Sequence, residues 1–192
     1  MSFSSRWRTL SLPALLLLAG TASATAPAFV AGYFADARLA GAGRLTWFGL
    51  HVYDARLLVP AQFNAADPLA APLVLELTYA RELDGVKIAE RSRDEIANLG
   101  LGTEPQRAGW LDSMKRVFPD VKRGTRIGGV YLRERGARFY VDGQFAGAIE
   151  DETFARAFFS IWLDPRTSAP RLREALLRSA APAARDGAAA SK

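Results

Sequence analysis

The sequence contains no cysteine and only one histidine, His51. The absence of cysteine excludes disulfides, thiolate nucleophiles and cysteine-based metal sites. A single histidine excludes a histidine-rich metal cluster, and the chain has no Gly-x-Ser-x-Gly motif to supply the serine of a hydrolase triad. We therefore expect neither a metal ion nor a cofactor in this protein.

Long hydrophobic runs are also missing. The apolar stretch Leu10–Leu18 is shorter than the roughly 20 residues that span a bilayer. Arg6 and Arg8 precede it, and the small residues Ala22–Ala24 follow it. This order is typical of a secretory signal peptide. We predict that residues 1–24 are removed during export, leaving a periplasmic protein without stable membrane insertion. An uncleaved anchor is the alternative.

Neither positive nor negative charge dominates the sequence. The net charge is only +5 over 192 residues, and lysine occurs only four times. Such a balance does not indicate a nucleic-acid partner. The length and the 49 % hydrophobic content fit one domain with a full core. We place this domain at residues 27–178. The Ala-rich residues 179–192 are predicted to be a disordered tail.

The stretch Leu45–Leu58 is rich in β-branched, aromatic and leucine residues, which predicts a mostly buried strand. Gly49 lies in its middle, where a glycine marks a bulge or a close approach by a ligand. Thr46, His51 and Tyr53 lie within a few residues of this glycine. Thr46 is either a ligand donor or an ordinary strand residue, and His51 is either a general base or a satisfied core residue.

The remaining elements are predicted from periodicity and from turn residues. Their order, with strands first, then two helices, a hairpin and two more helices, indicates an α+β fold. Residues 27–40 are expected to be extended. The predicted strands are 73–80, 125–133, 138–141 and 144–149, with a turn at Asp142-Gly143; the predicted helices are 86–99, one starting at Thr103 and ending at Pro119, 152–163 capped by Asp151, and one from a Ser168 cap to Leu177.

One helix carries an aromatic stripe, Phe154, Phe158, Ile161 and Trp162, at helical spacing. Such a stripe either belongs to the core or lines a ligand pocket. Residues 122–126 and 133–138 form basic clusters at turns, which are either solvated or able to bind anions.

Six segments of the chain form a recognisable pattern in their order and spacing. They are Leu45-Thr-Trp-Phe-Gly-Leu-His-Val-Tyr-Asp-Ala-Arg-Leu57, Ile88-Ala-Glu-Arg-Ser92, Phe118-Pro-Asp-Val-Lys-Arg-Gly124, Gly129-Val-Tyr-Leu132, Arg138-Phe-Tyr-Val-Asp-Gly143 and the run from Ala155 to Pro170. Together they resemble the chalcone isomerase-like family of exported bacterial proteins, over about Phe29 to Leu177. The resemblance implies an open-faced β-sandwich, in which a helical layer covers a large antiparallel sheet and the ligand cleft lies between the two.

In plant chalcone isomerases, the resemblance implies, an arginine favours the reactive phenolate while threonine and tyrosine hydroxyls stabilise the enolate oxygen. Thr46 matches the threonine of that pattern. Arg38 is the nearest candidate for the arginine, with Arg44 second, and Ser160 corresponds to a threonine near the far ring of the substrate. The tyrosine is missing, since residues 86–88 are Val-Lys-Ile.

The family also resembles non-catalytic relatives that hold fatty acids, in which the arginine pairs with the carboxylate. Our leading hypothesis is therefore an exported protein that binds a small, apolar, anionic ligand such as a fatty acid or a phenolic compound. Arg38 or Arg44 would hold the anion, Thr46 would donate a hydrogen bond, and Phe158 and Trp162 would line the pocket. One alternative is a true isomerase, an intramolecular lyase acting on a chalcone-like enone. Another is an envelope structural or interaction protein. The oligomeric state stays open.

Overall fold

The computed structural model describes residues 26–179, so the predicted signal peptide and residues 180–192 of the predicted tail lie outside the described residues. Six strands form one antiparallel sheet in which each strand pairs with its neighbour in sequence, and four α-helices accompany it. The predicted α+β fold is therefore confirmed. The strands are β1 Arg38–Trp47, β2 Leu50–Val59, β3 Leu73–Tyr79, β4 Arg126–Leu132, β5 Gly136–Val141 and β6 Gln144–Ile149; the helices are α1 Gly85–Asn98, α2 Glu104–Val117, α3 Glu152–Leu163 and α4 Pro170–Leu177.

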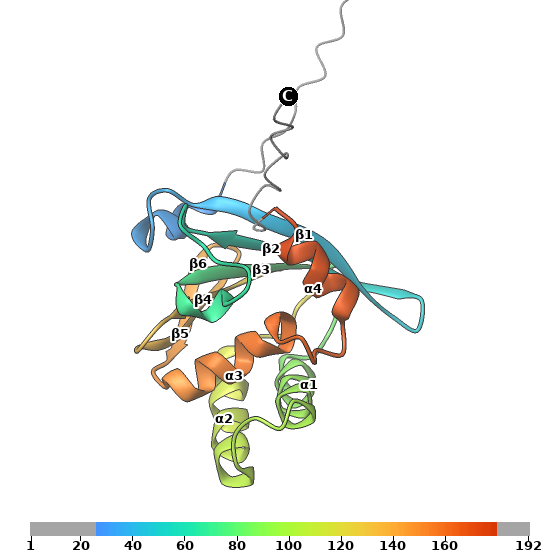
Figure 1. Ribbon diagram of the computed structural model, residues 1–192. Helices are drawn as coiled ribbons and strands as arrows, with labels where there is room; N and C mark the ends of the chain where they lie inside the picture. The colour runs from blue at the N-terminus through green and yellow to red at the C-terminus, as the bar shows by residue number, and fades with distance from the viewer. Residues whose placement is uncertain (1–25, 180–192) are drawn as a thin grey trace, which may run out of the picture.

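The helices lie on one face of the sheet (Figure 1). α3 packs against β4 and β5, α4 packs against β1 and β2, and α1 pairs with α2 and contacts α3. Because side chains alternate along a strand, β3 directs Leu73, Leu75, Leu77 and Tyr79 into this layer. The main hydrophobic core therefore lies between the sheet and the helices, as the alternation of this strand predicts.

The opposite face of the sheet is covered in part by the segment before β1. This segment contains a short 3-10 helix, η1 Ala28–Gly32, and not only the extended chain that we expected. The Phe29 ring stacks on Tyr140 with a centroid distance of 4.0 Å and lies over Gly128, where a side chain would collide with it. Val30 of η1 is buried, and the absent side chain of Gly128 provides the space for the Phe29 ring.

The stretch Leu45–Leu58 is not one strand, so that prediction is wrong. Phe48 and Gly49 have positive φ angles of 46° and 75°, and they form the turn of a hairpin between β1 and β2. Trp47 faces Leu50 across this turn. A two-residue hairpin turn with positive φ at both positions matches the twist of the flanking strands. Gly49 therefore marks the turn of a hairpin and not a bulge within a strand.

Most predicted helix ends and turns are confirmed. The Asp151 carboxylate accepts a hydrogen bond from the Phe154 amide at 3.0 Å, and Thr103 with Gln106 forms a capping box at the start of α2. Asp142 and Gly143 have φ angles of 48° and 86°, which is the expected hairpin turn. The predicted Ser168 cap of the last helix is wrong. Ala169 is the residue before α4, and the Ser168 hydroxyl donates instead to Glu95.

The position of α4 depends on two glycines of β1. A Cβ atom at Gly41 would lie 2.1 Å from the Ala175 carbonyl oxygen, and one at Gly43 would lie 2.8 Å from the Leu172 side chain. Only glycine allows the helix to approach this strand so closely. Among residues 26–179, no helix is both long and apolar enough to cross a membrane.

Candidate ligand-binding site

The aromatic stripe of α3 faces the sheet. The helix begins at the Asp151 cap, and its spacing places Phe154, Phe158 and Trp162 on one buried side. The rings of Phe154 and Phe158 are 5.5 Å apart, and those of Phe158 and Trp162 are 5.3 Å apart. The helix therefore presents a continuous row of rings to the interior.

Phe158 lies at the centre of a cluster of rings from several elements. Its ring packs edge-on against Phe139 of β5 at 5.4 Å and lies 5.8 Å from Phe118, which follows α2. Pairs with this geometry are favourable beyond the area that they bury. The interior at this point is therefore apolar and aromatic.

Two tyrosines form the polar end of this interior. The Trp162 indole nitrogen donates a hydrogen bond to the Tyr53 hydroxyl at 2.9 Å. Tyr79 lies on the adjacent strand, directly opposite Tyr53 in the register, with the two rings 5.8 Å apart. Among residues 26–179, no group accepts the hydrogen of the Tyr53 hydroxyl. This hydroxyl is therefore an available donor at the end of an aromatic interior.

Burial raises the pKa of both tyrosines far above the usual range, in the case of Tyr53 against the opposing effect of the hydrogen bond from Trp162. Both phenols are consequently neutral at any physiological pH. A neutral hydroxyl can donate to a carboxylate, a phenolate or a carbonyl oxygen without the repulsion that a charged phenolate would cause.

A buried carboxylate lies at the rim of this region. Glu95 of α1 is only 6 % exposed, and its oxygens accept hydrogen bonds from the Ser168 hydroxyl, at 2.8 Å, and from the Arg91 guanidinium. Glu95 also influences the pKa of Tyr53 through space. The Arg91 guanidinium lies 5.9 Å from the ring centre of Trp47 on the β1–β2 hairpin. The rim thus connects α1, the segment before α4 and the hairpin.

Of the residues predicted to contact a ligand, Phe158 and Trp162 lie together in this interior. Ser160 of the same helix is also buried, but its hydroxyl donates to the Arg156 carbonyl oxygen at 2.7 Å. That bond lies within the helix, so it occupies the hydroxyl that we expected near the substrate.

The three residues predicted to act on the anion lie along β1. Arg38 and Thr46 are eight residues apart on this strand, a separation of roughly 25 Å. Arg38 lies near the carbonyl oxygens of Ala61 and Ser179, each at 3.4 Å. Thr46 is exposed near the hairpin turn and faces His51. The structure therefore does not bring Arg38 and Thr46 together.

Arg44 lies on the face of the sheet opposite the helices. Its partner in the register is Asp54, and the Arg44 Nε atom lies 2.8 Å from the Asp54 carboxylate. The neighbouring pair in the register, Gly43 and Ala55, faces α4 and the core. Because adjacent residues point to opposite faces, the Arg44 side chain is separated from Trp162 by the sheet itself.

His51 belongs to the same polar face as Arg44. Its Nε2 atom lies 3.2 Å from the Asp54 carboxylate, although it makes no hydrogen bond of acceptable geometry among the described residues.

The surface has a shallow depression of about 570 Å³ on this polar face, lined by Arg44, Asp54, Arg56 and Thr78 together with small residues. A second depression, of about 490 Å³, lies between α2 and the end of β6. Neither depression includes Phe158 or Trp162. Residues 26–179 contain no group of three or more potential metal ligands.

Neither Glu95 nor Tyr53 is among the site residues predicted from the sequence. The signal for Glu95 was present, because it lies seven residues after Ile88 and three after Ser92, on the apolar stripe of α1. A carboxylate on such a stripe needs buried partners. The pairing of Tyr53 with Trp162 joins residues 109 positions apart, and no local pattern could have indicated it.

Comparisons with known proteins agree with this architecture. An uncharacterized protein of Haemophilus influenzae is 28 % identical over 149 residues, which cover 78 % of this chain and 72 % of that protein. The crystal structure of an Arabidopsis thaliana fatty-acid binding protein matches with a TM-score of 0.60 at 15 % identity, over 76 % of this chain and 88 % of that chain. At this level of identity the match shows a shared fold. The sequence profile described as chalcone isomerase-like matches residues 29–178, so the chain belongs to the chalcone isomerase-like family.

Proposed function

We propose that this protein is exported and binds a small, apolar, anionic molecule, a fatty acid or a phenolic compound, between the sheet and the helices. The main support for this proposal is the Tyr53 hydroxyl. It is a buried neutral donor at the end of a row of aromatic rings, and it accepts a hydrogen bond from Trp162. The rings would contact the apolar part of the ligand, and the hydroxyl would donate to its anionic oxygen. The similarity to a fatty-acid binding protein supports this choice of ligand.

The site in this proposal differs from the one that the sequence suggested. Phe158 and Trp162 remain lining residues, whereas Tyr53 takes the part of hydrogen-bond donor that we first gave to Thr46. Arg91, at the rim beside Glu95 and Trp47, is better placed than Arg44 to meet an anion that enters from the helix side. Binding requires the rings of Phe158 and Trp162 to move apart, so we expect the interior to be more adaptable than its packing suggests.

The test is calorimetric titration of the protein, recovered from the periplasm of its producing cells, with palmitate and with a flavanone. We expect saturable binding of at least one of them, with one ligand per chain. Tyr53→Phe removes the donor and keeps the ring, and we expect about tenfold weaker binding or more, because hydrogen bonds to charged groups contribute about 1.5–3 kcal/mol.

Tyr140→Phe is the matched control. It also removes one hydroxyl that is hydrogen-bonded to one partner, Tyr33 at 2.6 Å, but on the opposite face of the sheet. Its affinity should equal that of the unchanged protein. The proposal fails if neither ligand binds, or if the two variants lose affinity equally.

A further inference from the structure

Three large apolar side chains are exposed together at the turn of the β1–β2 hairpin. Trp47 is 57 % exposed, Phe48 is 87 % exposed and Leu50 is 51 % exposed. The Trp47 and Phe48 rings touch, with centroids 4.8 Å apart. The other exposed large hydrophobic residues among 26–179 lie outside this turn, Leu39 at the start of β1, Val86 at the start of α1 and Phe145 on β6. We call Trp47, Phe48 and Leu50 the apolar tip.

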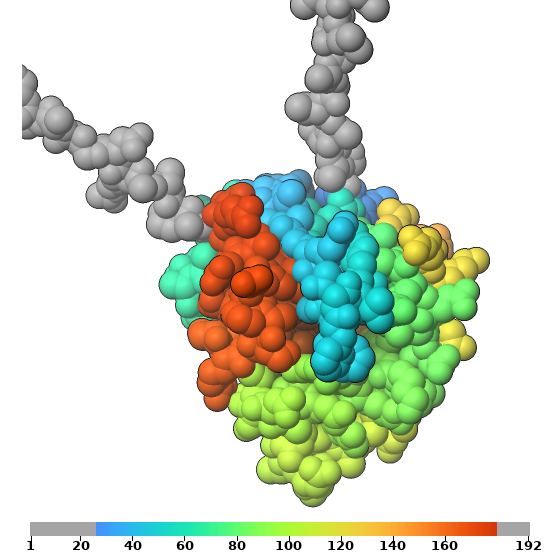
Figure 2. Space-filling model, turned by 90° about the vertical axis from the view of Figure 1, so that its right-hand side faces the viewer, coloured from blue at the N-terminus to red at the C-terminus, as the bar shows by residue number. Residues whose placement is uncertain are grey.

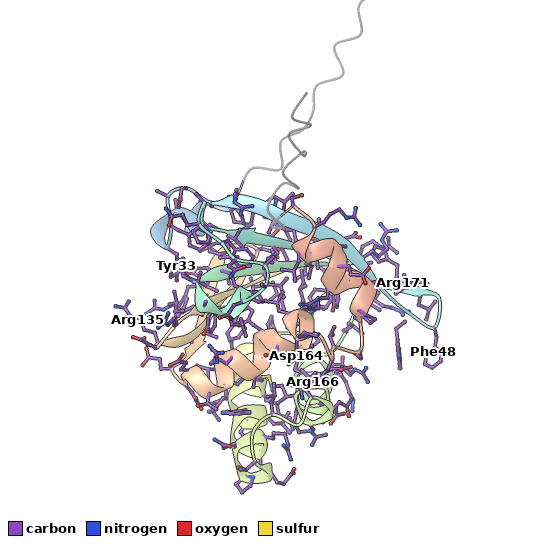
Figure 3. The ribbon with its side chains drawn as sticks, in the orientation of Figure 1. Tyr33, Phe48, Arg135, Asp164, Arg166 and Arg171 are labelled. Carbon is purple, nitrogen blue, oxygen red and sulfur yellow. The ribbon has the colours of Figure 1, made fainter. Side chains whose placement is uncertain are left out.

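The tip projects away from the body of the molecule. Figure 1 shows the hairpin extending beyond the helices, and Figure 3 shows Phe48 at the far end of this hairpin, outside the body of the fold. In Figure 2 the hairpin stands beside α4, above the green surface of the helical layer. A small convex tip of this kind can insert into a soft layer such as a membrane surface, but it does not provide the flat area of a protein–protein interface.

The backbone at the tip does not call for phenylalanine. Phe48 has a φ of 46°, a conformation that a bulky residue adopts at a cost. The other two-residue turn, Asp142-Gly143, has nearly the same φ angles and uses aspartate, one of the residues favoured there. Phe48 therefore strains its own turn without being buried by it, so its side chain is best explained by a contact outside the molecule.

The occupant that fits the tip is the interface of a lipid bilayer. The two aromatic rings and the leucine expose on the order of 300 Å² of apolar surface, well below the roughly 800 Å² per partner of a stable protein interface. Tryptophan and phenylalanine are favoured at the membrane–water boundary. Arg44 and Arg91 lie just behind the tip, with side chains that are 60 % and 58 % exposed.

These arginines suit a layer of phosphate headgroups. Arg44 is paired with Asp54, which is half exposed, and an exposed pair of this kind is weak enough to be exchanged for a phosphate. Arg91 contacts the Trp47 ring directly. Arg171 of α4 lies on the same side of the molecule as Phe48 (Figure 3).

We propose that the hairpin inserts its apolar tip into the surface of a phospholipid bilayer and docks the protein there reversibly. This docking does not depend on the ligand site. It places the rim formed by Trp47, Arg91 and Glu95 next to the lipid, where an apolar molecule could pass between the two.

The test is partitioning of the protein, as recovered from its producing cells, onto vesicles of phosphatidylethanolamine and phosphatidylglycerol, with no fatty acid present. We expect binding to increase with the phosphatidylglycerol content and to weaken with salt. Phe48→Asn should weaken the partition coefficient about tenfold or more, as expected from the loss of one buried phenylalanine. Asparagine tolerates positive φ, so this variant should fold at least as stably as the unchanged chain.

Phe145→Asn is the matched control, because Phe145 is likewise an exposed phenylalanine, at 56 %, but lies on β6. Its partition coefficient should not change. Brominated lipids should also quench Trp47, the one exposed tryptophan among the described residues, since Trp110 and Trp162 are buried. Absence of vesicle binding, equal binding by the Phe48→Asn variant, or an equal loss in both variants would overturn the proposal.

Discussion

The indole nitrogen of Trp162 donates a hydrogen bond of 2.9 Å to the hydroxyl of Tyr53, joining α3 to β2 across the interface of helices and sheet. Both side chains are more than nine-tenths buried. The bond therefore fixes the helix against the strand and leaves the hydroxyl with a hydrogen to donate. The stability of the fold and the proposed binding of a ligand depend on the same pair of residues.

Tyr53→Phe should lower the free energy of unfolding by about 1–3 kcal/mol, because the buried N–H group of Trp162 loses its acceptor. Urea unfolding of the two proteins measures this difference. The double variant Tyr53→Phe/Trp162→Phe contains no unpaired N–H group. Its free energy of unfolding should therefore fall by less than the sum of the decreases in the two single variants. Additive losses would show that the hydrogen bond contributes nothing.

Gly41→Ala should destabilise the protein by about 1–3 kcal/mol or more, because the new methyl group would collide with the Ala175 carbonyl oxygen of α4. Thermal unfolding followed by circular dichroism measures the loss. Gly109→Ala is the control. Gly109 lies within α2 with nothing within 4 Å of the added carbon, so alanine there should raise stability by about 0.5–1 kcal/mol. Equal effects at the two positions would contradict the close contact of α4 with β1.

Stability should fall as the pH rises from about 10 to about 12. Burial raises the pKa of Tyr140 from 10.0 to about 12 in the folded protein, so the neutral phenol favours the fold. This contribution is complete below pH 10 and is lost as the pH passes through the folded value. The raised pKa values of Tyr53 and Tyr79 act in the same direction.

Two measurements check this pH dependence. Urea unfolding at a series of alkaline pH values gives the stability, and the ultraviolet absorbance of tyrosinate gives the ionisation of the folded protein. Tyr140→Phe should show a smaller loss of stability over this range. Complete ionisation of the tyrosines near pH 10 in a protein that is still folded would contradict the assignment.

We expect the protein not to accelerate the cyclisation of 2′-hydroxychalcone. The groups that the family resemblance assigned to such a reaction do not converge, since Arg44 lies on the face opposite Trp162 while Arg38 and Thr46 lie far apart on β1. The decay of chalcone absorbance with and without protein measures the rate. A faster decay that Thr46→Val abolishes would restore the isomerase alternative.

Local patterns predicted most of the elements of this fold. Alternation identified β3, helical spacing and the Asp151 cap identified α3, and Asp142-Gly143 identified the last hairpin. The first hairpin was not predicted, because phenylalanine is not a typical turn residue and the composition of residues 45–58 favours one continuous strand. Phe48, whose residue type does not fit its turn conformation, is also the residue to which we assign a contact outside the molecule, with the lipid bilayer.

The candidate site was harder to predict than the fold. The aromatic stripe of α3 predicted that Phe158 and Trp162 share one face of the helix. It could not indicate which side chain of the sheet would contact them. That depends on the register of β2 against β3 and on the position of α3 over the sheet, both set by contacts distant in sequence. Arg44 was a candidate for the cleft through the family resemblance, which does not reveal the face of the strand that a residue occupies when a bulge interrupts the strand. β1 has two such irregularities.

Native mass spectrometry of the protein, gently extracted from its own producing cells, shows directly whether the protein holds a ligand and whether Tyr53 is needed to hold it. We predict a chain that begins at Thr25 and carries one additional apolar anion, which fragmentation would identify as a carboxylic acid or a phenol. In the Tyr53→Phe variant this additional mass should be largely lost, and in Tyr140→Phe it should remain. A bare mass for the unchanged protein that stays bare after incubation with palmitate and with a flavanone would rule out the proposed ligand-binding function.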